Sequence, residues 1–308
     1  MVVIIGPTAI GKSELALSVA QCFPAEIISA DSRQVYRYMD IGTAKPGAEE
    51  RAGVPHHVIN VVDPDQEFTL AMYHRLALDA RRSIERQGKL PLLVGGSGLY
   101  VWSLVEGWKI PEVPPDQELR RHLEERAERE GSQLLYRELQ AIDPEAAARI
   151  DPHNTRRIIR ALEISHATGQ IPSRLQQKEP PDFPVLIIGL TQERGELYKR
   201  IDSRVDDMIQ RGLITETEQL LKRGYAPKLP SMSGIGYRQM VEFLLGEMTL
   251  SEAVDKMKYE THRMARRQYA WFRPRDRRIR WFDIGDANDR ASAVVLAKVK
   301  ELIGGFVS

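Results

Sequence analysis

The chain has 308 residues, of which 42% are hydrophobic and 28% are charged. This length suits one large domain or two modest ones, and the composition excludes intrinsic disorder. Its 44 basic and 43 acidic residues leave a net charge of only +1, so a nucleic-acid-binding surface has to be sought in the local distribution of charge.

The single cysteine, Cys22, excludes an intrachain disulfide and a metal site built from cysteine pairs. It favours a reducing compartment, and we expect its thiol to lie in the core on the buried face of a helix. No apolar stretch reaches the roughly 20 residues of a membrane span, and the first residues lack the features of a secretion signal. We therefore expect a soluble, cytoplasmic protein without a membrane partner.

Segments typical of strands and helices alternate in the N-terminal part of the chain. A β-branched run predicts a buried strand at 2–5, and a helix is predicted at 12–23. A second strand is predicted at 26–30, a long amphipathic helix at 70–87 and a third strand at 90–94. This alternation predicts a parallel sheet flanked by helices, with loops and ligands at the carboxyl ends of the strands.

Two proline-rich stretches then enclose a charged block with helical periodicity, and an apolar run directly after the block predicts another buried strand at 185–190. We therefore expect an all-helical insertion domain at 112–183. The expected α/β core consists of residues 1–111 and 184–308, and its last part is mainly helical.

A glycine-rich loop follows the first predicted strand. Residues 6–13 read GPTAIGKS and match the P-loop pattern GxxxxGK[ST] in full, between a strand and a helix. Backbone amides, the charge of Lys12 and the helix dipole would bind a di- or triphosphate, and Ser13 would bind Mg²⁺ or a phosphate oxygen. The predicted diphosphate-binding residues are Gly6, Pro7, Thr8, Ala9, Ile10, Gly11, Lys12 and Ser13.

The P-loop alone does not indicate nucleotide hydrolysis or phosphoryl transfer. The chain has no NKxD run for guanine recognition, and the third strand ends in Gly-Gly-Ser-Gly rather than in an acidic residue. Asp31, at the end of the second strand, is the acidic candidate near the loop. Which phosphate compound binds is left open by these residues.

Basic and aromatic residues concentrate near the end of the chain. Between Lys256 and Arg280 ten lysines and arginines stand against two acids, with four aromatic residues among them. This combination is typical of RNA binding, and a solvated helix face is the alternative. The acids are Glu260 and Asp276, and the aromatic residues are Tyr259, Tyr269, Trp271 and Phe272.

Eight segments, in order along most of the chain, resemble the tRNA dimethylallyltransferases, also called tRNA isopentenyltransferases. Two hydroxyl residues, Ser13 and Ser97, stand where the family often has threonine, and both keep the hydroxyl. The segments are GPTAIGKS at 6–13, DSRQVY at 31–36, IGTAKP at 41–46, GVPHHVI at 53–59, VGGSGLY at 94–100, DPEAAARIDPHNTRRIIRALE at 143–163, SGIGYRQ at 233–239 and RMARRQYAWFR at 263–273.

The resemblance implies a P-loop NTPase-like core with an all-helical insertion that grips the anticodon stem-loop of tRNA. It implies transfer of a dimethylallyl group from dimethylallyl diphosphate to N6 of adenosine 37, with release of pyrophosphate and a requirement for Mg²⁺. Nothing in the sequence demands a partner subunit, so we expect a monomer.

This chemistry requires a base for the adenine amine and stabilisation of the departing pyrophosphate. The family pattern places the general base at Asp31, for which a magnesium ligand or a helix cap is the alternative. Arg204 is the candidate for stabilising the leaving pyrophosphate. Arg200 lies one helical turn away and could serve instead, and a surface ion pair is the alternative role for Arg204. Ser97 would hydrogen-bond the adenine or orient Asp31, or would cap the following helix.

For the RNA, Gln34 is expected to read a base edge and Tyr237 to stack on a base. His56 and His57 lack a third metal ligand, so we expect a loop role near the donor or the tRNA rather than a zinc site. The predicted tRNA-binding residues are Asp31, Ser32, Arg33, Gln34, Ser97, Arg120, Arg156, Arg157, Arg160, Gly236, Tyr237 and Arg238.

Two other classes of protein share part of this pattern. A small-molecule P-loop kinase would use the loop for ATP but has no need of a long basic segment. An RNA-binding module with a structural P-loop would not need Asp31 and Ser97 to converge on that loop.

Overall fold

A computed structural model describes residues 1–175, 177–285 and 289–307. The chain forms two compact units, one of residues 1–105 and 182–308 and the other of residues 106–181. None of the helices in the described residues combines the length and the apolar character needed to cross a bilayer.

The larger unit is built on a sheet of six parallel strands in the order β3-β2-β4-β1-β5-β6. The apolar side chains of the central strands are buried on both faces, as expected for a parallel sheet. The strands are β1 (Val2–Ile5), β2 (Ala25–Ala30), β3 (His56–His57), β4 (Leu90–Gly95), β5 (Leu186–Thr191) and β6 (Ile279–Asp283).

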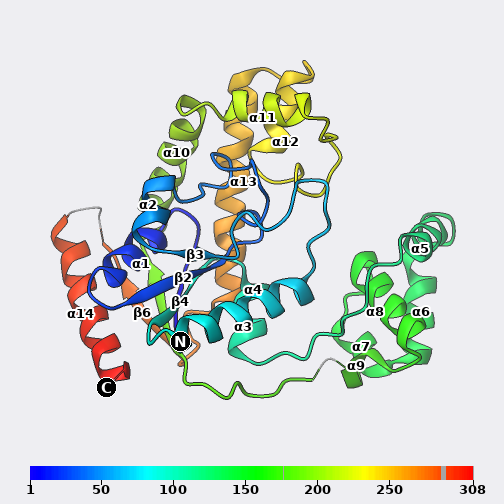
Figure 1. The fold of residues 1–308 in the computed structure, drawn as a ribbon. Helices are drawn as coiled ribbons and strands as arrows, with labels where there is room; N and C mark the ends of the chain where they lie inside the picture. The colour runs from blue at the N-terminus through cyan, green and yellow to red at the C-terminus, as the bar shows by residue number, and fades with distance from the viewer. Residues whose placement is uncertain (176, 286–288, 308) are drawn as a thin grey trace. The chain divides into compact units, whose positions relative to one another are not determined.

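Helices cover both faces of this sheet (Figure 1). On one side lie α1 (Lys12–Ala20) and α14 (Asp289–Val307), and Leu15 and Val299 belong to the same hydrophobic cluster as Ile4 of β1. On the other side lie α3 (Leu70–Arg86) and α4 (Gly98–Val105). Thr69 caps α3 by accepting a hydrogen bond from the amide of Met72 at 3.2 Å.

The remaining helices of this unit gather beyond the carboxyl ends of the strands (Figure 1). The longest, α13, begins with a capping box formed by Thr249 and Glu252 and packs against α10 and α12. These helices are α2 (Ala48–Gly53), α10 (Arg194–Gln210), α11 (Leu213–Lys222), α12 (Tyr237–Leu244) and α13 (Leu250–Trp271).

A carboxylate organises the loop that follows β2. Glu216 of α11 accepts hydrogen bonds from the amides of Ile41 and Gly42 and, at 2.6 Å, from the hydroxyl of Tyr237. Nearby, the ammonium group of Lys45 is buried and donates to Asp40, Asn60 and the carbonyl of Tyr36. The segment IGTAKP is therefore a structural element of this loop.

The smaller unit is helical and has its own core, which includes Leu123, Leu139 and Ile158. Residues before and after the helices join through a bridge between Trp108 and Lys178. The helices are α5 (Gln117–Glu130), α6 (Ser132–Ile142), α7 (Pro144–Arg149), α8 (Thr155–Thr168) and α9 (Pro172–Leu175).

A buried carboxylate lies at the centre of the helical unit. Both oxygens of Glu163, which is 0% exposed, are paired with the guanidinium groups of Arg120 and Arg160, and one also accepts the amide of Asp116 at 2.7 Å. Burial alone would raise the pKa of Glu163, but these hydrogen bonds outweigh it and hold the pKa below its ordinary value.

The predicted parallel sheet and its strands at 2–5, 26–30, 90–94 and 185–190 are confirmed, with shifts of one residue at some ends. The short edge strand β3 and the strand β6 were not predicted. The strand β6 was missed because Ile279 and Arg280 lie in a stretch that is mostly basic and therefore does not resemble a buried strand.

Two further expectations need correction. The first helix ends at Ala20 instead of 23, so Cys22 is exposed and does not belong to the core. The helical unit spans 106–181 instead of 112–183, because the amide of Glu179 bonds the carbonyl of Gly107 and thereby joins the two ends of the unit.

We predict that Glu163→Gln destabilises the helical unit by about 2 kcal/mol. Removing one member of a buried ion pair leaves uncompensated charge, and the 27% and 32% exposure of Arg120 and Arg160 reduces the cost. The lowered pKa makes this contribution present above the ordinary pKa of 4.5 and lost as the pH falls through the lowered value. Hydrogen exchange of the α8 amides measures the loss.

The matched control is Glu145→Gln, which removes an exposed ion pair with Arg149 in the same unit. It should change the stability by less than about 0.5 kcal/mol. Equal effects of the two substitutions would show that Glu163 has no special role.

Candidate functional site

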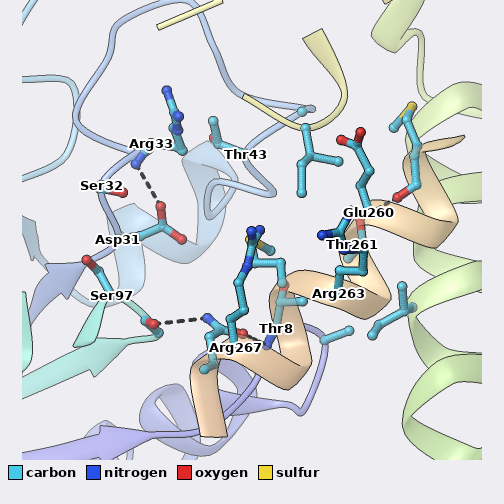
Figure 2. Close-up of a pocket in the computed structure, with 18 of the residues that line it drawn as sticks. Thr8, Asp31, Ser32, Arg33, Thr43, Ser97, Glu260, Thr261, Arg263 and Arg267 are labelled. Carbon is cyan, nitrogen blue, oxygen red and sulfur yellow. Dashed lines mark hydrogen bonds between the residues drawn. The ribbon is translucent and has the colours of Figure 1, made fainter. Parts of the chain in front are cut away.

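The register of the sheet brings three loops to one edge. Ile5 of β1 pairs with Gly95 of β4, and Gly95 pairs with Ala30 of β2, so the three strands end in one row. A cavity of about 670 Å³ lies at this edge, lined by the loops after these strands and by α10 and α13. The expected convergence of the P-loop with the loops of Asp31 and Ser97 is therefore confirmed (Figure 2).

The P-loop is fixed by its backbone and by one core side chain. At Gly6, with φ of +150°, an added Cβ would lie 2.7 Å from the carbonyl oxygen of Leu190, so no other residue fits. Ile10 is buried in the core below the loop. Of the loop residues, Thr8, Ala9 and Lys12 line the cavity.

Two cations stand at the P-loop side of the cavity. The pKa of Lys12 is lowered from 10.5 to about 7, mainly by burial and also by Arg204, while Asp31 partly compensates. The Lys12 ammonium donates to the carbonyl of Pro7 at 2.6 Å. Burial also lowers the pKa of Arg204, against the opposing effect of Asp31 and Glu14. Two neighbouring, partly desolvated cations make this side of the cavity a favourable place for an anion.

The structure distinguishes the two candidate arginines of α10. Arg204 lines the cavity, with Nη1 3.4 Å from the hydroxyl oxygen of Thr8. Arg200 does not line it, and its Nε donates to the carbonyl of Ala9 at 2.9 Å. Arg200 therefore supports the P-loop from outside the cavity.

Asp31 lies at the end of β2 in a turn in which Oδ1 accepts the amide of Arg33 at 2.8 Å. Its other oxygen, Oδ2, has no hydrogen-bond partner in the part of the chain that the structure describes. Ser97 is held by a bond from its amide to the carbonyl of Ala30 at 3.1 Å. Figure 2 shows Asp31 and Ser97 facing α13 across the cavity.

Helix α13 supplies one wall of the cavity. From the sequence, Glu260 and Trp271 of this wall were named only as members of a basic, aromatic segment and were not assigned to the site. Arg263 and Arg267 add positive charge there, and Glu260 adds a carboxylate that pairs with Arg238. The helical spacing of the wall residues was the available signal. The wall consists of Met257, Glu260, Thr261, Arg263, Met264, Arg267, Gln268 and Trp271.

Several predicted tRNA-binding residues of the larger unit lie at or near the cavity. Ser32, Arg33 and Arg238 line it, and Arg33 also donates to the carbonyl of Pro230 at 2.7 Å. The side-chain oxygen of Gln34 accepts a hydrogen bond from the hydroxyl of Ser29 at 2.9 Å, and its side-chain nitrogen donates to two backbone carbonyls at 3.3 and 3.4 Å. That Gln34 reads a base edge stays a prediction. It would require the side-chain nitrogen to break its bonds at 3.3 and 3.4 Å.

The expectation that Tyr237 stacks on a base is wrong for this structure. Its ring is 1% exposed, packs against Gly42 and holds Glu216 through its hydroxyl. Gly236 begins α12 with φ of +101° and donates its amide to Gln239 instead of facing the cavity. Tyr237 and Gly236 therefore support the wall of the cavity from outside the cavity.

In the helical unit, Arg120 and Arg160 form ion pairs with Glu163, and their binding of tRNA stays a prediction. Arg156 and Arg157 are exposed and have no ion-pair partner among the described residues. His56 and His57 form the edge strand β3 instead of a loop, and His57 bonds Glu26 of β2 at 2.7 Å.

The donor atoms restrict how a metal ion could be held. Within the described residues no three His, Cys, Asp or Glu side chains are grouped as a metal site. The exposed hydroxyl of Ser13 and the carboxylate of Asp31 are hard oxygen donors, of the kind that binds Mg²⁺ together with phosphate oxygens. The residues therefore fit a Mg²⁺ ion that arrives with a diphosphate.

Comparison with known proteins gives a consistent result. Sequence profiles of families described as IPP transferase and isopentenyl transferase match residues 34–275 and 1–59. A tRNA dimethylallyltransferase of Thermomicrobium roseum is 50% identical over 92% of this chain and 86% of its own.

Solved structures agree over 99% of this chain. A full-length tRNA isopentenylpyrophosphate transferase from Bacillus halodurans is 41% identical, with a TM-score of 0.72 and 95% of its chain covered. A eukaryotic dimethylallyltransferase described as acting on tRNA is 30% identical, with a TM-score of 0.84 and 79% of its chain covered. The core has the P-loop NTPase-like fold of these enzymes, and the chain belongs to the IPP transferase family of tRNA dimethylallyltransferases.

Proposed function

We propose that this chain transfers the dimethylallyl group of dimethylallyl diphosphate to N6 of adenosine 37 in the anticodon loop of tRNA. The observation that carries the proposal is that the P-loop, the carboxylate of Asp31 and a basic helix line one cavity. The names of the relatives support the transfer of a dimethylallyl group to tRNA.

In this reaction the bond between N6 and the allylic C1 forms while the bond from C1 to the diphosphate oxygen breaks. The N6 lone pair is delocalised into the purine, so the amine needs a base as the new bond forms. The free Oδ2 of Asp31 takes the proton, and pyrophosphate leaves with the bonding electron pair.

Charge stabilisation of pyrophosphate is the second task of the site. The amides of the P-loop, the ammonium of Lys12 and the guanidinium of Arg204 act here. A Mg²⁺ ion held by Ser13 and the phosphate oxygens would neutralise further negative charge. The five carbons of the donor would pack on apolar wall residues such as Val205, Met208 and Met264.

The acceptor base has to leave the stack of the anticodon loop to reach Asp31. Arg263 and Arg267 on α13 would bind its neighbouring phosphates, and Arg156 and Arg157 would bind the stem from the helical unit. The P-loop, Asp31 and α13 line one cavity without a residue from a partner subunit, so a monomeric enzyme is proposed. A substrate as abundant in the cytoplasm as tRNA, together with a single cysteine, supports a cytoplasmic location.

The direct test is incubation with unmodified tRNA, Mg²⁺ and radiolabelled dimethylallyl diphosphate, in parallel with labelled ATP. Label should reach the tRNA from the prenyl donor alone, and nucleoside analysis should find it on N6 of adenosine 37. Label transferred from ATP, or no label on RNA from either donor, would refute the proposal.

We predict that Asp31→Asn lowers the rate of transfer by about 10² to 10⁴-fold. The asparagine oxygen can still accept the amide of Arg33, so the turn and the affinity for tRNA should remain. Single-turnover transfer and tRNA binding are measured together, with Asp63→Asn as the control on a half-buried carboxylate that does not line the cavity. A matching loss of tRNA affinity would make Asp31 a structural residue.

We predict that affinity for an inert thiolo analogue of dimethylallyl diphosphate falls roughly fivefold to tenfold from pH 7 to pH 8. Since the pKa of Lys12 is about 7, its ammonium is charged below that pH and neutral above it in the free protein. Calorimetric titration measures the affinity. Lys12→Arg is the control, because arginine stays charged throughout. Profiles of the same slope would contradict the assignment.

We predict that replacing both Arg156 and Arg157 by alanine weakens tRNA binding and makes its salt dependence shallower by about one to two units of slope. The control pair is Arg129→Ala with Arg149→Ala, two arginines of the same unit already engaged in exposed ion pairs. Filter binding over a range of salt measures the slope. Equal slopes for the two double variants would remove Arg156 and Arg157 from the tRNA-binding surface.

A further inference from the structure

The side chain of Gln268 on α13 connects two of the three loops of the cavity. Its Oε1 accepts the amide hydrogen of Thr8 in the P-loop at 2.8 Å, and its Nε2 donates to the carbonyl of Gly96 at 3.0 Å. Gly96 immediately precedes Ser97. We propose that Gln268 is a positioning residue that holds the P-loop and the Ser97 loop at the separation required for prenyl transfer. This inference rests on the proposed function.

The two hydrogen bonds fix the orientation of the amide. A backbone N–H can only donate and a carbonyl can only accept, so one end of the bridge must be an acceptor and the other a donor. Glutamine offers both on one planar group. A glutamate would lose the donor, and an apolar side chain would lose both bonds.

Close packing around the bridge restricts its movement. A Cβ on Gly96 would lie 2.2 Å from Nε2 of Gln268, so the loop leaves no room for a side chain there. One turn further along α13, the ring of Trp271 packs on Gly98, where a Cβ would lie 2.3 Å away. The carbonyl of Trp271 accepts Nε1 of Trp102 of α4 at 3.0 Å. The end of α13 is thus held to the Ser97 loop at both residues.

The bridge also reaches the leaving-group side of the cavity. Thr8, whose amide Gln268 holds, lies 3.4 Å through its hydroxyl oxygen from Nη1 of Arg204. Gln268 therefore links the place of the diphosphate to the place of the acceptor base. Losing the bridge should misalign the reacting atoms while each substrate still binds to its own loop, because errors of about 1 Å are enough to cost about 10²-fold in rate.

The experiment compares Gln268→Met and Gln268→Glu in single-turnover prenyl transfer. Gln268→Met should lower the rate about tenfold to hundredfold and leave the affinities for the donor analogue and for tRNA nearly unchanged. Gln219→Met on α11, an exposed glutamine outside the cavity, is the matched control and should behave as the wild type.

The pH dependence of the transfer rate of Gln268→Glu distinguishes a positioning role from a merely structural one, which would leave that dependence unchanged. A protonated carboxyl group has one donor and one acceptor, as the amide has, whereas the carboxylate can only accept. The rate of Gln268→Glu relative to wild type should therefore rise as the pH falls from about 8 to about 6, since Asp31, which lines the same cavity, and the diphosphate favour the protonated acid. The relative rate of Gln268→Met should stay flat.

Three outcomes would overturn the inference: a wild-type rate in Gln268→Met, a flat relative pH profile in Gln268→Glu, or a fall in melting temperature that accounts for the lost activity. A wild-type protein that fails to transfer the prenyl group at all would refute the proposed function instead. The wild-type reaction thus separates the two failures.

Discussion

The parallel register of β1, β2 and β4 is the constraint on which the site depends. Because Ile5, Gly95 and Ala30 lie in one row, the residues that follow them leave the sheet side by side. They are Gly6, which opens the P-loop, Asp31, and Gly96, which precedes Ser97.

Fully buried apolar side chains on both faces hold this row in place. A slip of one residue in a strand would move its whole set of side chains to the opposite face and displace the loop at its end. The packing of the core therefore determines the distances between the reacting groups.

Electrostatics decides what such a row of loops can bind. Lys12, Arg204, Arg263 and Arg267 share a cavity with few acids. Cations brought together and partly desolvated destabilise one another, which is why the pKa of Lys12 is low. An arriving diphosphate relieves this repulsion. The cavity also holds two acids: Glu260, which pairs with Arg238, and Asp31, which we propose as the base.

Much of this organisation could be predicted from the sequence. Short apolar runs identified the central strands, and the rules of parallel sheets then brought Asp31, Ser97 and the P-loop together. The strand β6 was not predicted because its neighbours in the sequence are mostly charged, a composition that is not typical of a strand.

Roles that depend on tertiary contacts could not be read from the sequence. In the sequence Tyr237 resembles a residue that stacks on a base, whereas in the structure it is enclosed by Gly42 and Glu216. Arg120 finds Glu163 more than forty residues along the chain, whereas the pairing of Arg160 with Glu163, at i+3, was visible in the sequence. Gln268 bridges two loops that are distant in sequence from it and from each other, which no local pattern reports.

The central claim is that the P-loop holds a prenyl diphosphate while Asp31 meets an extruded adenine in the same cavity. A crystal structure with an anticodon stem-loop and the inert thiolo donor tests it most directly. We predict the diphosphate on the P-loop amides beside Lys12 and Arg204, and N6 of adenosine 37 within hydrogen-bond distance of Asp31. A diphosphate bound elsewhere, or an adenine still stacked in the anticodon loop, would contradict the account.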